Sequence, residues 1–185
     1  TEYFPPSLPK SIGKENLSVT HLSFRRKKSF IFENLNFSLP VGRITALTGK
    51  NGAGQTTLAM VLTGLWKQSG GEIYISGKSL SAGKRRKAVW YSSNDTGTQF
   101  FTNSVTDELF LSGGQKQRLS IACGLLSDRE ILLFDEPTSG LDGGNMRIIA
   151  SVLTNAAARG KTILVITHDK ELMQACCNFR WELGQ

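Results

Sequence analysis

Two adjacent carboxylates, Asp135 and Glu136, close the apolar run Ile131–Phe134 and precede a Pro-Thr-Ser-Gly turn. An apolar run that ends in a turn is typical of a buried parallel strand, and open α/β sheets bind their ligands at the carboxyl ends of such strands. Because successive strand residues point opposite ways, one carboxylate can face a metal ion and the other a reacting water. The alternative is an acidic pair that only caps a neighbouring helix.

A glycine-rich segment, Gly49–Thr57, lies between an apolar run at 44–48 and a helical pattern at 58–65. Strand, glycine loop and helix is the arrangement that holds phosphate groups, because glycines allow successive amides to converge at the positive end of a helix. A glycine-rich turn without a ligand is the alternative. The residues expected to contact a nucleotide here are Gly49, Asn51, Gly52, Ala53, Gly54, Gln55, Thr56 and Thr57.

One residue departs from the phosphate-loop pattern GxxxxGK[ST], which otherwise fits from Gly49 to Thr56. Gln55 stands where the pattern requires lysine, and Lys50 lies too early in the loop to replace it. Glutamine can donate a neutral hydrogen bond to a phosphate oxygen, but charge-assisted bonds are about twice as strong. We therefore expect weakened nucleotide binding and a larger loss in transfer chemistry.

The remaining patterns predict an α/β fold in which strands alternate with helices. Helices are expected at 58–65, 105–110, 112–126 and 146–157. Strands are expected at 17–24, 35–39, 44–48, 72–76, 88–92, 131–134, 162–167 and 179–183, with the first two short and joined by a basic turn.

The 185 residues are one domain's length, with 39% hydrophobic and 20% charged residues. The net charge of +7 gathers at Arg25–Lys28 and Lys84–Lys87. We expect both runs at solvated hairpin tips, and no aromatic residues alternate with the charges, so a nucleic-acid partner is not expected. Residues 1–15 are proline-rich and predicted to be a linker before a domain at 16–185, in a chain cut from a longer polypeptide.

Cys123 falls in the helix expected at 112–126, and Cys176 and Cys177 fall in an apparent helix between the last two expected strands, all without metal-ligand spacing. This pattern favours buried thiols in a reducing compartment over a disulfide framework. No apolar run approaches the roughly 20 residues that cross a bilayer. Any membrane role is therefore expected to come through partners.

Five segments in order resemble the nucleotide-binding domain of ATP-binding cassette (ABC) proteins. GKNGAGQTT resembles the Walker A loop, LSGGQ the signature, ILLFDE the Walker B strand, SGLD the D-loop, and His168 the switch histidine. The resemblance covers about 16–185. It implies a P-loop-type, mostly parallel sheet flanked by helices, with an antiparallel N-terminal β subdomain.

The resemblance also implies roles for individual residues. Glu136 and His168 would be catalytic, and Thr56, Asp135 and Asn94 would serve Mg²⁺, with Asn94 in the place of the Q-loop glutamine. Arg26 would stack on adenine, with Phe24 as the alternative. Ser112, Gly113 and Gly114 of the signature would act on ATP held by a partner domain, and Gln115 and Asp142 would also contact nucleotide.

One family element is missing from the sequence: the helical subdomain expected before the signature, since Phe110 meets Leu111 directly. Either this subdomain was deleted from the protein, or it is absent only from this sequence. The stretch QFFTNSV is closest to the energy-coupling-factor and cobalt-type importers, which indicates an ATPase for a vitamin or metal-ion importer at the cytoplasmic face of the membrane. The expected partners are integral membrane subunits and a second nucleotide-binding domain, in a homodimer, a heterodimer or a tandem fusion. A regulatory half that does not hydrolyse ATP, and a soluble cassette ATPase acting on ribosomes or nucleic acid, are the alternatives.

Overall fold

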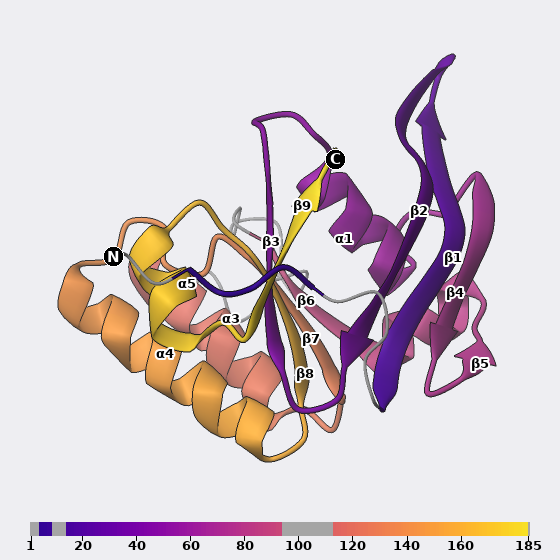
Figure 1. Ribbon diagram of the computed structural model, residues 1–185. Helices are drawn as coiled ribbons and strands as arrows, with labels where there is room; N and C mark the ends of the chain where they lie inside the picture. The colour runs from indigo at the N-terminus through magenta and orange to yellow at the C-terminus, as the bar shows by residue number, and fades with distance from the viewer. Residues whose placement is uncertain (1–3, 9–13, 94–112, 185) are drawn as a thin grey trace.

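The computed structural model describes residues 4–8, 14–93 and 113–184. Its central sheet is parallel, with the strand order β6-β7-β8-β3-β9 (Figure 1). These strands are β3 (Ile44–Gly49), β6 (Val89–Ser92), β7 (Ile131–Asp135), β8 (Thr162–Ile166) and β9 (Phe179–Leu183). A second sheet is antiparallel, with the order β2-β1-β4-β5, and consists of β1 (Glu15–Arg26), β2 (Ser29–Pro40), β4 (Gly70–Ile75) and β5 (Lys78–Ser79).

Helices cover both faces of the parallel sheet. Figure 1 shows α1 on the side of the antiparallel sheet, and α3, α4 and α5 on the opposite side. Apolar side chains fill two clusters, one on each side of the parallel sheet. The helices are α1 (Gln55–Thr63), α2 (Ala82–Ala88), α3 (Gly113–Leu126), α4 (Gly143–Ala158) and α5 (Lys170–Cys176).

The predicted fold class is confirmed: an α/β protein with a parallel sheet and an antiparallel N-terminal sheet. The apolar run at 131–134 is fully buried, which explains why it contains no polar residue. The two first strands are longer than expected, with 12 residues each. The helix expected at 105–110 and the junction between Phe110 and Leu111 lie outside the described residues.

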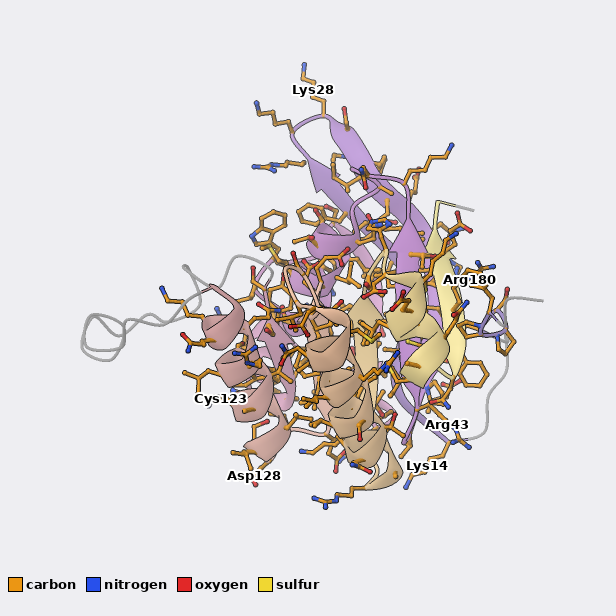
Figure 2. All side chains as sticks on the ribbon, turned by 90° about the vertical axis from the view of Figure 1, so that its left-hand side faces the viewer. Lys14, Lys28, Arg43, Cys123, Asp128 and Arg180 are labelled. Carbon is orange, nitrogen blue, oxygen red and sulfur yellow. The ribbon has the colours of Figure 1, made fainter. Side chains whose placement is uncertain are left out.

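Only one of the two basic runs lies at a hairpin tip. Lys28 lies at the turn between β1 and β2, where Figure 2 shows its side chain extending from the molecule. The prediction was wrong for Lys84–Lys87, which belong to α2. Arg85 from this run is buried, and it donates to Leu80 O at 2.7 Å, Val61 O at 3.2 Å and Gln68 Oε1 at 3.0 Å. Its guanidinium therefore joins α2 to the C-terminal end of α1, where carbonyl groups carry negative partial charge.

The cysteine prediction is correct for two residues of three. Cys176 and Cys177 are buried, whereas Cys123 is exposed on α3. All three are free thiols. Among the described residues, no helix is long and apolar enough to cross a membrane.

The described part of the N-terminal segment lies against β9. Leu8 N donates to Arg180 O at 2.7 Å, and Arg180 N donates to Pro6 O at 2.8 Å. The cationic groups of Lys170 and Arg180 lie 5.9 and 5.8 Å from the centre of the Phe4 ring. Residues 4–8 therefore pair with the edge strand of the parallel sheet, while the division into a linker at 1–15 and a domain at 16–185 stays a prediction.

We expect Arg85→Ala to lower the free energy of unfolding by about 2–4 kcal/mol, because it removes three hydrogen bonds and leaves a cavity. Urea denaturation measures this change. Arg86→Ala is the matched control: Arg86 is the exposed neighbour in the same helix, and its loss should cost no more than about 0.5 kcal/mol. Equal effects of the two substitutions would contradict a structural role of Arg85.

Candidate functional site

The segments singled out in the sequence meet at one edge of the parallel sheet. β7, β8 and β3 are neighbours, so their carboxyl ends lie side by side. β3 leads into the glycine loop and α1, β7 ends at Asp135, and β8 leads into Thr167 and His168. Strand order alone therefore brings the predicted phosphate loop and the predicted carboxylates together, at the edge where such sheets bind ligands.

The glycine loop leaves the first amides of α1 open to a ligand. Gly52 and Gly54 have φ values of 82° and 101°, in the left-handed region that favours glycine. A Cβ on Gly54 would lie only 2.6 Å from Ile31 Cγ2 of β2. Gly54 is also the N-cap of α1, and because glycine has no side chain, it cannot cap the first amides of the helix. Amides at a helix start that lack a side-chain cap are suited to bind an anion.

Gln55 is the first residue of α1 and is 7% exposed. Its Nε2 donates to Gly49 O at 3.1 Å, so the side chain folds back onto the start of the loop. The amide supports the loop from within and brings no positive charge. A lysine at this position would supply the ammonium group that triphosphate binding favours.

Thr56 and Asp135 join α1 to β7. Thr56 Oγ1 donates to Asp135 Oδ2 at 2.7 Å. Burial raises the pKa of Asp135, and the hydrogen bonds from Thr56 and Tyr91 oppose this effect. The described residues contain no cluster of three or more His, Cys, Asp or Glu that could hold a metal by itself. One hydroxyl and one carboxylate nevertheless fit Mg²⁺, which prefers oxygen ligands and keeps several waters.

Tyr91 is a site residue that sequence reasoning missed. It lies on β6, the neighbour of β7, and its phenol donates to Asp135 Oδ2 at 3.2 Å. Burial and then the negative charge of Asp135 raise the pKa of Tyr91, so the phenol stays protonated. In the sequence, Tyr91 is marked only as a polar aromatic residue in the short strand predicted at 88–92.

Glu136 and His168, the two residues predicted to be catalytic, lie together. Glu136 has a φ of 47°, which is uncommon for a residue with a side chain, and its N–H donates to Ile166 O at 2.8 Å. Thr167 Oγ1 donates to Glu136 Oε2 at 3.2 Å, and His168 Nε2 lies 4.0 Å from Oε1. Burial raises the pKa of Glu136, while His168 and Thr167 act in the opposite direction.

Two further aspartates order the loops around these carboxylates. Asp169 caps α5 by accepting from Leu172 N at 3.1 Å, and it also accepts from Thr138 Oγ1 at 2.9 Å. Asp142 caps α4 by accepting from Asn145 N at 2.8 Å, and the hydrogen bonds from Asn145 lower the pKa of Asp142. A contact of Asp142 with a nucleotide stays a prediction.

Comparison with known proteins gives the family. Residues 32–109 and 93–139 match the sequence model of the ABC transporter family, and together they span more than half of the chain. The chain belongs to the ABC transporter family. A Treponema denticola relative named as an ABC transporter ATP-binding protein is 35% identical over 203 residues, covering 94% of this chain and 42% of that protein.

Two further ABC proteins are similar. YkoD of Bacillus subtilis, named as an HMP/thiamine import ATP-binding protein, is 33% identical over 198 residues, which cover 88% of this chain and 36% of YkoD. The solved structure of cbiO1 from Clostridium perfringens, part of the ABC transporter complex cbiONQ, has a TM-score of 0.72 and 26% identity, covering 85% of this chain and 80% of cbiO1. This chain thus spans less than half of the length of these two curated relatives.

Of the signature LSGGQ, only Gly113, Gly114 and Gln115 lie among the described residues. Asn94 and Ser112, predicted to contact the nucleotide, lie outside the described residues. α3 begins at Gly113, and Gly114 and the exposed Gln115 follow in its first turn. The glycines thus lie at the start of a helix, as the ABC signature predicts, while their contacts with ATP stay predictions.

Arg26 and Phe24, the two residues predicted to stack on adenine, both contact Trp66. The Arg26 guanidinium lies 5.6 Å from the centre of the Trp66 ring. Phe24 stacks on the same ring at 5.5 Å between centroids and is 9% exposed, so it offers little surface to a base. Exposed Arg26 is therefore better placed than Phe24 to stack on adenine.

We expect Glu136→Gln to raise the free energy of unfolding at pH 7. Because burial raises the pKa of Glu136 above its ordinary 4.5, ionisation is less favourable in the folded chain than in the unfolded chain. This cost is absent below the ordinary pKa and grows as pH rises through the folded-state pKa. Urea denaturation from pH 4 to pH 8 should therefore show a higher free energy of unfolding for the variant than for the parent at pH 7. This difference should narrow toward pH 4.

Glu33→Gln is the control for this series, since Glu33 is exposed on β2. It should change stability by no more than about 0.5 kcal/mol across the series. A Glu136→Gln variant that is less stable at pH 7, or a gap that does not depend on pH, would refute the predicted effect of burial.

Proposed function

We propose that this chain binds Mg-ATP and hydrolyses it as the ATPase subunit of a membrane importer. The observation that carries the proposal is the hydrogen bond of 2.7 Å between Thr56 and Asp135 at the start of α1. It sets two oxygen ligands suited to Mg²⁺ beside amides suited to phosphate. Membership of the ABC family supports the same assignment.

Each site residue has a role in this proposal. The loop amides would bind the phosphates, and Thr56 Oγ1 and the Asp135 carboxylate would hold Mg²⁺. Bound Mg²⁺ neutralises charge on the phosphate oxygens. Glu136 orients or deprotonates the attacking water, a role that its raised pKa favours, because a base works best with a pKa near the operating pH. His168 contacts the γ-phosphate.

The importer assignment rests on the relatives. YkoD carries a thiamine-import name, and cbiO1 is part of a transporter complex. We propose that this chain likewise serves a vitamin or metal-ion importer, bound to integral membrane subunits at the cytoplasmic face of the membrane. In this arrangement the signature of one nucleotide-binding domain completes the ATP site of a second one.

Gln55 favours a second candidate, a regulatory half that binds ATP and scarcely hydrolyses it. Its side chain contacts Gly49 and supplies no charge to the triphosphate. The complete set of Thr56, Asp135, Glu136 and His168 favours hydrolysis instead. We propose that the site keeps its catalytic groups and works slowly because one cation is lacking.

We expect Gln55→Lys to tighten ATP binding by roughly one to two orders of magnitude, since one charge-assisted hydrogen bond contributes about 1.5–3 kcal/mol. Phosphate release should increase by a larger factor, because charge on the γ-phosphate grows in the transition state. Calorimetric titration with Mg-ATP and a steady-state phosphate assay measure the two effects.

The control for this gain is Glu136→Gln in the Gln55→Lys background. It should keep the improved ATP affinity and lose phosphate release, because the carboxylate acts on the water rather than on the nucleotide. If Gln55→Lys improves neither binding nor turnover, Gln55 is not the cause of a weak site. If turnover survives the loss of Glu136, the base lies elsewhere.

We expect Gly114→Asp to abolish ATP-dependent dimerisation, because its carboxylate at the start of α3 would repel the phosphates of a partner's ATP. Light scattering with and without Mg-ATP, in the Gln55→Lys background, measures the change in mass. Gly83→Asp adds the same charge at an exposed position of α2 and should leave the dimers intact. ATP-driven dimers that tolerate Gly114→Asp would contradict a signature that acts on the partner's nucleotide.

A further inference from the structure

Asp135 accepts hydrogen bonds from two hydroxyl groups that lie on different elements of the fold. Thr56 donates from α1 at 2.7 Å, and Tyr91 donates from β6 at 3.2 Å. We propose that Tyr91 is a positioning residue for the Asp135 carboxylate and thereby sets the strength of Mg²⁺ binding in the ATP site. This inference rests on the proposed Mg-ATP function and adds a residue to it.

Strand register explains how Tyr91 reaches Asp135. Tyr91 pairs with Leu133 across the parallel β6–β7 ladder, and Asp135 follows Leu133 by two residues. Side chains two residues apart on a strand lie on the same face of the sheet. Tyr91 and Asp135 therefore share the face that α1 covers, and the length of the phenol spans the offset between them.

Both hydroxyls donate to the same carboxylate oxygen, Oδ2. A single donor would let the carboxylate turn about that hydrogen bond, whereas two donors from separate elements fix its plane. Among the described residues no side chain donates to Oδ1, so this oxygen is the one that can face a cation or its water. Thr56 is expected to contact Mg²⁺ itself, which leaves Tyr91 as the donor that acts on Asp135 alone.

Tyr91 is itself held in place, as a positioning residue must be. Its ring packs against the apolar cluster between the two sheets, and its phenol also hydrogen-bonds with Ser93. A tyrosine has only two side-chain torsions, so a packed ring loses little further entropy when it orders its hydroxyl. Phenylalanine would fill the same space, and the hydroxyl is what adds the contact with Asp135.

The test compares Tyr91→Phe with the parent chain in a Mg²⁺ titration of ATP binding, followed with a fluorescent ATP analogue. We expect the Mg²⁺ concentration for half-maximal binding to rise about threefold to tenfold, the loss typical of one hydrogen bond. Binding of the analogue in EDTA should stay unchanged, since Tyr91 acts through the metal site. Tyr91→Met, which also lacks the donor, should give the same shift.

Tyr74→Phe is the matched control, because Tyr74 donates to the carboxylate of the exposed Glu72 on β4, away from the site. It should leave the Mg²⁺ dependence unchanged. If Tyr91→Phe leaves the Mg²⁺ concentration for half-maximal binding unchanged, the positioning role is overturned while the proposed function stands. The same holds if the variant loses ATP binding equally with and without metal. A parent chain whose ATP binding ignores Mg²⁺ overturns the proposed function itself.

Discussion

The hydrogen bond between Thr56 and Asp135 is the contact on which the candidate site depends, because it joins α1, the helix predicted to bind phosphate, to the strand that carries the carboxylates. It requires β7, β8 and β3 to be neighbours, so that a residue at the end of β7 can reach the start of α1. It also requires the register that the fully buried run at 131–134 imposes on β7. Displacement of β7 by one residue would turn Asp135 to the opposite face.

Local patterns predicted the parts of the site that lie within one strand and its loop. The glycines, Thr56, Asp135, Glu136 and His168 are each marked by neighbours in the sequence, and their meeting follows from the rule for parallel sheets. Tyr91 could not be placed in this way, since its partner is 44 residues away and its role depends on cross-strand register. Asn94 and Ser112 lie outside the described residues.

Arg85 shows why a charge pattern misled. Four basic residues in a row are usually solvated, and Lys84, Arg86 and Lys87 are indeed exposed here. Arg85 is buried because its acceptors, the carbonyls of Val61 and Leu80 and the amide of Gln68, lie in other segments. Burial lowers the pKa of Arg85, but a guanidinium stays charged and can satisfy several carbonyls at once. Nothing in the spacing of the run distinguishes this residue from its neighbours.

The site also concentrates features that do not stabilise the folded chain. Glu136 has a left-handed backbone, and burial raises the pKa of both Asp135 and Glu136, so two carboxylates are held where ionisation is unfavourable. Gln55 supplies no cation to offset them, and His168 lies 4.0 Å from Glu136 on an exposed segment. Bound Mg²⁺ would supply the missing positive charge, and the loop amides would supply partial charges for the phosphates. The arrangement would therefore be most favourable with metal and nucleotide both bound, as the proposed function requires.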